Sequence, residues 1–114
     1  MNMKKMIFVL GVVMIIPFNA LAFDIYGWWK STNSSVLVKI TSDRIHSFPY
    51  RVEEKDDSVV KIYVKNSAHP CFIYKKDDDT ILMKKPIGPK EEYRLVTRNI
   101  NLSREEVRKL CKEN

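Results

Sequence analysis

Recognisable catalytic and metal-binding motifs are missing from this sequence. The two histidines, His46 and His69, lie outside any H-E-x-x-H spacing, and no serine lies in G-x-S-x-G. The two cysteines form no C-x-x-C pair, and the acidic run 77–79 leads into a strand-like segment rather than the glycine and glutamate of a calcium loop. We therefore expect no catalytic residue, no metal and no cofactor. An enzyme would need two or more of four side chains to converge in one pocket, namely His46, His69, Asp43 and Glu92.

A long hydrophobic run is also missing. The apolar stretch Met6–Ile16 falls short of the about 20 residues that span a bilayer. Two lysines precede it, and a proline and small residues follow it, so the layout predicts a cleavable secretory signal peptide over residues 1–22. No cysteine stands at the cleavage point, so we expect no lipid anchor, and because the apolar run is removed with the signal peptide, we expect no stable membrane span after cleavage. The single mature domain, residues 23–114, is expected in a bacterial periplasm or outside the cell.

Cysteine is scarce, and its two copies have a structural interpretation. An oxidising compartment favours disulfides, and a domain of about 92 residues has marginal stability without one. We therefore expect Cys71 and Cys111 to form a disulfide. The bridge would close a loop of about 40 residues and stabilise the domain by about 4 kcal/mol on the chain-entropy estimate.

Neither sign of charge dominates the chain, which carries 20 basic and 14 acidic side chains. The lysines are spread along the sequence among carboxylates, which is not a nucleic-acid signature. The pattern favours a solvated surface that is mildly attractive to an acidic partner.

Alternation of apolar and polar residues predicts a mainly β domain. Six segments share this alternation or a high content of strand formers, and they span residues 36–41, 48–53, 60–65, 71–76, 80–85 and 93–97. Polar turns separate them at close intervals. We expect a small antiparallel meander or barrel of six to eight strands, with Pro49 at a sheet edge or a bulge.

The end of the chain changes period and predicts a C-terminal helix. Ser103 and Glu106 have the spacing of a capping box at its start. Val107 and Cys111 fall on one helical face. We expect this face to pack on the sheet, where a bridge from Cys111 to Cys71 would pin the helix.

Aromatic residues are numerous for a small domain, and they serve both core filling and binding. The adjacent Trp28 and Trp29 must point to opposite faces of a strand. We expect Trp29 in the core, and Trp28 either outward or beneath the terminal helix. The candidate residues for binding a ligand or partner are Trp28, Tyr63 and Ile87, the last at the tip of a rigid, basic loop between two prolines.

The stretch Gly27-Trp28-Trp29 contains G-x-W and resembles the opening motif of lipocalins and related calycin barrels. The resemblance implies that Trp29 closes one end of a barrel and that Arg94 or Arg98 stacks over it. Eight strands of about 9 residues would use about 72 of the about 92 mature residues. We therefore expect a reduced barrel without a roomy lipid cavity.

These observations favour a non-catalytic exported binding module that recognises a protein or a small ligand through an aromatic surface. The alternative is an inhibitor or immunity protein that neutralises a toxin or hydrolase, since small size and export fit that function too. An envelope assembly accessory and a small enzyme are less favoured. No nucleic-acid partner is expected.

Overall fold

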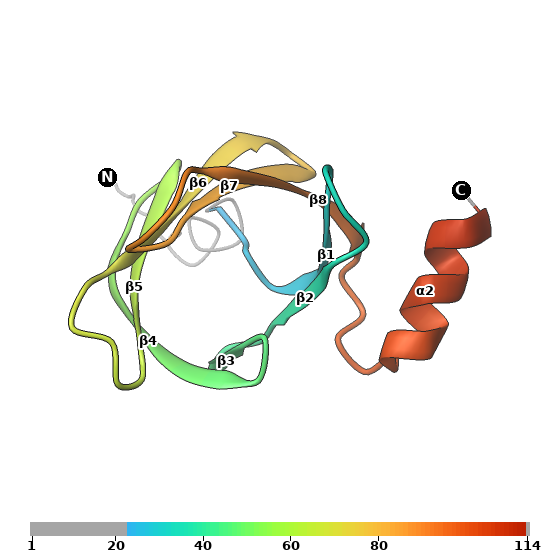
Figure 1. Cartoon of the computed structure of the whole chain (residues 1–114), viewed down its shortest axis with the longest axis horizontal. Helices are drawn as coiled ribbons and strands as arrows, with labels where there is room; N and C mark the ends of the chain where they lie inside the picture. The colour runs from blue at the N-terminus through green and yellow to red at the C-terminus, as the bar shows by residue number, and fades with distance from the viewer. Residues whose placement is uncertain (1–22, 114) are drawn as a thin grey trace, which may run out of the picture.

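Strands follow one another around a closed antiparallel barrel in the order of the sequence (Figure 1). The computed structural model describes residues 23–113, so the predicted signal peptide at residues 1–22 lies outside the described residues. Within this range the expectation of a mainly β domain with a C-terminal helix is confirmed. The elements are β1 (Gly27–Ser31), β2 (Leu37–Ile40), β3 (Arg44–Ile45), β4 (Phe48–Lys55), β5 (Val59–Val64), β6 (Cys71–Asp77), β7 (Thr80–Lys84), β8 (Glu91–Thr97) and α2 (Arg104–Glu113).

Pairing of β1 with both β2 and β8 closes the sheet, which removes its edges. The predicted edge position of Pro49 is therefore wrong, because Pro49 lies within the closed sheet, opposite Arg44 of β3. It does not form the bulge of β4 either, because the register shifts farther along, between Val52 and Glu54. The strand pairing tolerates the proline, which has no N–H to donate, because Pro49 takes part through its carbonyl. This carbonyl accepts a hydrogen bond from the Lys65 amide at 2.8 Å.

The barrel closes within a short chain because its strands are short. The shortest, β3, has two residues and did not stand out in the sequence. It is joined to β4 by His46 and Ser47, whose φ angles of 50° and 77° match the two-residue turn that suits a hairpin twist. Glycine or asparagine usually fills such positions, so the sequence carried no signal for this hairpin.

Side chains alternate between the barrel interior and its outer surface as the sequence predicts. Ile62 and Ile73 are fully buried inside, whereas Tyr63 and Tyr74 lie on the outer wall and are only partly covered. The prediction fails on β4, where Tyr50 is buried but Phe48 is exposed. Phe48 stands where β4 begins, at one end of the barrel, so no strand covers it.

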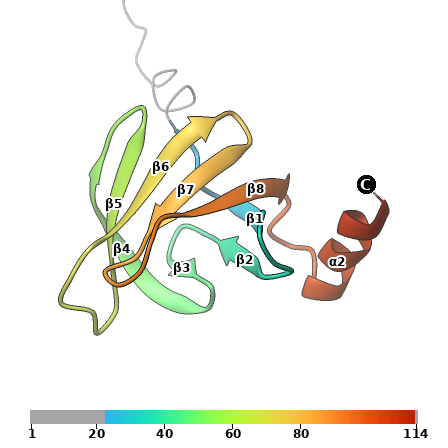
Figure 2. The ribbon, with the colours of Figure 1, turned by 45° about the horizontal axis from the view of Figure 1, so that its top comes forward.

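The helix α2 packs against the outside of the barrel beside β1, β2 and β8 (Figure 2). Trp28, Leu37 and Val107 form the centre of this contact, and Cys111 packs against it. The predicted capping box is confirmed. The Ser103 amide donates to Glu106 Oε1 at 2.9 Å, and the Glu106 amide donates to Ser103 Oγ at 3.2 Å.

The predicted disulfide between Cys71 and Cys111 is wrong, since both thiols are free. The side chain of Cys71 belongs to the core inside the barrel, whereas Cys111 belongs to the cluster outside it. The barrel wall lies between them, and a disulfide requires adjacent Cβ atoms. Separately, no helix within residues 23–113 has the length and apolar character needed to cross a membrane.

Candidate functional site

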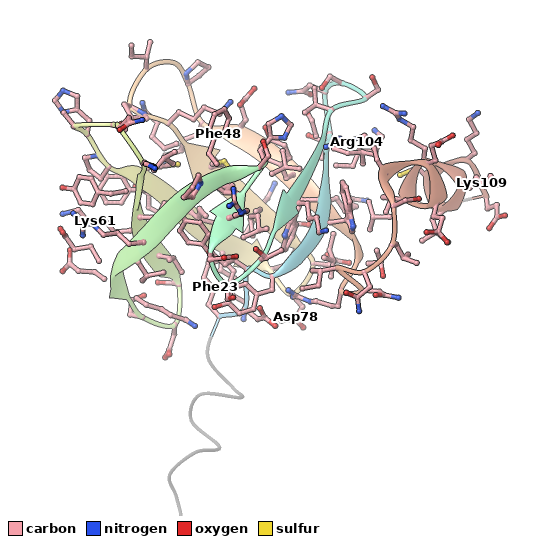
Figure 3. All side chains as sticks on the ribbon, turned by 90° about the horizontal axis from the view of Figure 1, so that it is seen from below. Phe23, Phe48, Lys61, Asp78, Arg104 and Lys109 are labelled. Carbon is pink, nitrogen blue, oxygen red and sulfur yellow. The ribbon has the colours of Figure 1, made fainter. Side chains whose placement is uncertain are left out.

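The two ends of the barrel differ in how they are covered. One end, which we call the closed end, holds the segment 23–26 and the connections 41–43, 56–58 and 78–79. The other end, which we call the mouth, holds the connections 32–36, 46–47, 65–70 and 85–90. Figure 3 shows the barrel from the side, with Phe48 at the mouth and Phe23 and Asp78 toward the closed end.

The N-terminal segment plugs the closed end. Phe23 and Ile25 are buried in the core, and Trp29 Nε1 donates to the carbonyl of Ile25 at 2.9 Å. The Arg98 guanidinium lies over the Trp29 ring at 5.5 Å from its centroid. The arrangement implied by the G-x-W resemblance is therefore present, with Arg98 rather than the exposed Arg94 as the stacking residue.

A cavity of about 400 Å³ opens at the mouth. Its walls are mainly apolar and include Val38, Ile45, Val64 and Met83. The expectation of no roomy cavity rested on eight strands of about 9 residues each, which would leave little chain for the connections. Short strands instead leave chain for the long connections 65–70 and 85–90, which extend the walls beyond the strand ends.

Three nitrogen-bearing side chains line the edge of this cavity, namely His46, His69 and Lys85. Lys85 Nζ lies 3.4 Å from Glu91 Oε1 in an exposed ion pair. Tyr93 also lines the cavity, and its hydroxyl donates to the same Glu91 oxygen at 3.4 Å. Burial and the neighbouring Glu91 charge raise the pKa of Tyr93, so this hydroxyl stays a neutral donor.

Cys71 lines the same cavity, but it lacks the features of a catalytic thiol. Burial raises the pKa of Cys71 to about 11, and the nearby charges of Lys85 and Lys84 only partly oppose this rise. The thiol is therefore protonated near neutral pH and is a weak nucleophile. Among residues 23–113 it has no hydrogen bond to His46 or His69 that would activate it.

The side chains that an enzyme would need are brought together only in part. His46 and His69 share the cavity. Asp43 lies at the closed end and accepts a bond from Thr41 Oγ1 at 3.0 Å. Glu92 lies outside the cavity lining and pairs with Lys76 at 3.1 Å. Among residues 23–113, therefore, no carboxylate lines the mouth cavity next to the two histidines.

Of the predicted binding residues, Trp28 is not accessible. It is 3% exposed and lies beneath α2, which was one of its two expected places. Arg104 and Lys39 stand over its ring at 5.2 and 5.7 Å. Its Nε1 is buried and has no hydrogen-bond partner among the described atoms.

Tyr63 and Ile87 are accessible, but they lie in different places. Tyr63 is on the outer wall, where Arg51 covers its ring at 4.7 Å. Ile87 is at the mouth and is almost fully exposed. The sequence missed two other exposed residues of the mouth, Val36 and Phe48. The sequence did not distinguish exposure from burial at these two positions, because both continue an alternating pattern that is typical of a strand with one face in the core.

The closed eight-strand antiparallel barrel with its C-terminal helix is consistent with a calycin-like fold. Comparison of the chain with protein-family models, with curated proteins and with solved structures finds no match. The chemistry of the mouth therefore carries the functional argument.

Proposed function

We propose that this protein is a non-catalytic binding barrel that holds a small, mainly apolar ligand in the mouth cavity. The observation that carries the proposal is the cavity itself, about 400 Å³ in volume with mainly apolar walls. This volume lies within the about 300–1,000 Å³ that is usual for small-molecule sites. The G-x-W resemblance to lipocalins, a family of binding barrels, supports the same conclusion.

The edge of the cavity favours a ligand with an anionic end. Lys85 is the cation of this edge, and its ion pair with Glu91 is exposed. Exposed ion pairs contribute about 0–1 kcal/mol, so Lys85 can exchange Glu91 for a ligand at little cost. An apolar body would then fill the cavity while a carboxylate, sulfonate or phosphate group meets Lys85.

Export remains part of the proposal, on the strength of residues 1–22. A buried thiol of raised pKa resists oxidation, so a free Cys71 is compatible with an oxidising compartment. Mass spectrometry of the exported protein should give a mature chain that begins at Phe23. Recovery of the intact N-terminus would contradict this part of the proposal.

Two dyes test the cavity, namely 1-anilinonaphthalene-8-sulfonate and its uncharged relative N-phenyl-1-naphthylamine. We expect both to bind with enhanced fluorescence. Met83→Trp fills the cavity and should abolish binding, whereas Leu82→Trp adds the same ring to the outer wall and should not. If Met83→Trp disturbs folding by circular dichroism, Ser67→Trp blocks the cavity edge instead. Dye binding that survives blocking of the cavity would contradict the proposal.

The same dyes test the anionic end. Lys85→Ala should weaken binding of the sulfonate by about fivefold, the loss of about 1 kcal/mol, and leave the uncharged dye unchanged. Lys55 is the control, because it is exposed at the closed end of the barrel and does not line this cavity. Equal effects of Lys85→Ala and Lys55→Ala would show that overall charge, and not the cavity edge, attracts the anion.

A further inference from the structure

Exposed apolar side chains gather at the mouth of the barrel. Of the five exposed large apolar side chains among residues 23–113, Tyr26 at 39% lies at the closed end and Val52 at 44% lies on β4, whereas three lie at the mouth, namely Val36 at 47%, Phe48 at 56% and Ile87 at 89%. These three come from three different connections or strand ends at the mouth. Val36 and Phe48 also line the cavity, as does Pro86 beside Ile87, so the three residues surround its opening. Such clustering on a small domain marks an interaction surface.

The connections at the two ends of the barrel differ in charge: those at the closed end are mainly acidic and those at the mouth are basic. The connections at the closed end carry Asp24, Asp43, Asp56, Asp57, Asp78 and Asp79, and one basic residue there, Arg98, lies 3.6 Å from Asp24 Oδ1. Among the described residues the mouth connections carry Lys65, Lys85 and Lys90 and no carboxylate, while Lys84 ends β7 and Glu91 begins β8 next to them. Lys84 Nζ donates to the carbonyl of Lys85 at 2.7 Å, which directs this ammonium toward the mouth. The apolar cluster is thus framed by cations and lies far from most of the acidic loops.

The connection that carries Ile87 is built to present an apolar tip. Pro86 and Pro89 restrict the backbone on either side, and Gly88 takes a φ of 104° that other residues rarely adopt. No atom lies within 4 Å of the position that a Gly88 Cβ would take, so the tip stands clear of the protein. A stiff loop holds Ile87 in solvent at no further cost in conformational entropy when it binds.

We propose that the mouth docks reversibly on a membrane surface rich in anionic lipids. Ile87 and Phe48 enter the boundary between headgroups and acyl chains, and the mouth lysines meet the lipid phosphates. A cluster of protruding apolar side chains bordered by lysines suits this occupant, because lipids mould around protruding side chains and lysine stems extend to the headgroups. Each lysine near an anionic surface strengthens binding by about fivefold. Docking would set the cavity opening against the membrane.

Vesicle flotation of the mature protein tests this docking without any ligand in the cavity. We expect binding to vesicles of phosphatidylcholine with about 30% phosphatidylglycerol and none to phosphatidylcholine alone. Binding should fall at least fivefold when salt rises from about 50 to about 500 mM. Equal binding to both kinds of vesicle, or none to either, would overturn the proposal.

Matched variants locate the contact. Ile87→Ser should reduce vesicle binding at least fivefold, whereas Val52→Ser, at an exposed apolar position outside the mouth, should leave it unchanged. The pair Lys85→Ala and Lys90→Ala should act like Ile87→Ser, and the pair Lys75→Ala and Lys76→Ala should act like Val52→Ser. Equal losses in mouth and control variants would overturn the proposed contact.

Two further outcomes distinguish membrane docking from ligand binding in the cavity and from binding of a protein partner. Met83→Trp should lose dye binding and keep vesicle binding, so docking and ligand binding fail independently. If wild-type protein ignores vesicles but binds an acidic protein in a way that Ile87→Ser abolishes, the mouth is a protein interface and the membrane proposal is wrong. That second result would favour an inhibitor.

Discussion

The guanidinium of Arg98 lies over the indole ring of Trp29, with 5.5 Å between Cζ and the ring centroid. The same group donates to the carbonyls of Asp24 and Tyr26 at 2.9 and 2.6 Å. Arg98 thus joins the end of β8, the N-terminal segment and the core at one point. These contacts hold the N-terminal segment against the end of β8 at the closed end of the barrel.

Loss of Arg98 should therefore destabilise the whole domain. Arg98→Ala removes two charge-assisted hydrogen bonds and a cation–π contact, so we expect the free energy of unfolding to fall by about 2–3 kcal/mol. Arg98→Lys keeps the charge but not the forked geometry, and should recover less than half of this loss. Urea denaturation measures both variants. Arg94→Ala, at an exposed position on β8, which Arg98 directly follows, is the control, and a loss there as large as at Arg98 would contradict this account.

The strands were predictable because alternation survives at the level of single residues. On β5, Lys61 and Tyr63 face outward while Ile62 is fully buried, as a period of two requires. The hairpin at His46 and Ser47 was not predictable, because its backbone conformation is imposed by closure of the barrel rather than by residue preference. Tertiary constraint outweighed local propensity there.

The prediction of a disulfide was wrong for a reason that the alternation of residues in the sequence already indicates. The alternation of β6 places Cys71 on the same face as Ile73, which points inward. A helix cannot enter a filled barrel, so the apolar face that carries Cys111 had to pack outside. Both cysteines are covered, but on opposite sides of the wall. The mouth cavity lacked even this signal, because it is assembled from four connections that are distant in the sequence.

The two tryptophans should respond very differently to removal of the indole nitrogen. Trp29 Nε1 donates to the Ile25 carbonyl, so Trp29→Phe leaves a buried acceptor unpaired and a void, and should cost about 3 kcal/mol. Trp28 Nε1 has no partner among the described atoms, so Trp28→Phe loses no hydrogen bond; it loses packing, weakens the contacts with Arg104 and Lys39, and should cost about 1 kcal/mol. Urea denaturation compares the pair. Equal costs would show that the Trp28 nitrogen has a partner in solution.

Gly27 should tolerate no side chain. A Cβ there would lie 2.8 Å from the Thr97 carbonyl oxygen and 3.0 Å from Leu95 Cδ1, and the φ of 143° is itself unfavourable for other residues. We expect Gly27→Ala to lower the free energy of unfolding by more than about 2 kcal/mol. Gly88→Ala is the matched control, since it carries the cost of φ without any clash, about 1 kcal/mol. Thermal unfolding that ranks the two in the opposite order would refute the close contact.

The reactivity of Cys71 should depend steeply on pH. Peptide mapping without reductant should recover Cys71 and Cys111 as separate free thiols. In the native protein, alkylation of Cys71 should be slow near neutral pH and should accelerate about tenfold per pH unit until about pH 11, because only the thiolate reacts. A linked Cys71–Cys111 peptide, or rapid alkylation of Cys71 at neutral pH, would contradict its place inside the barrel.

The same thiol links folding to alkaline pH. Burial raises the pKa of Cys71 from its usual 9.0 to about 11, so between these values the folded chain keeps a proton that the unfolded chain has released. The stabilising contribution is therefore complete below about pH 9 and is lost as pH rises toward about 11. Cys71→Ala should make the pH dependence of unfolding shallower in this window. Part of the slope should remain, because burial also raises the pKa of Tyr93. A slope unchanged by Cys71→Ala would show that other groups, Tyr93 among them, account for the alkaline loss.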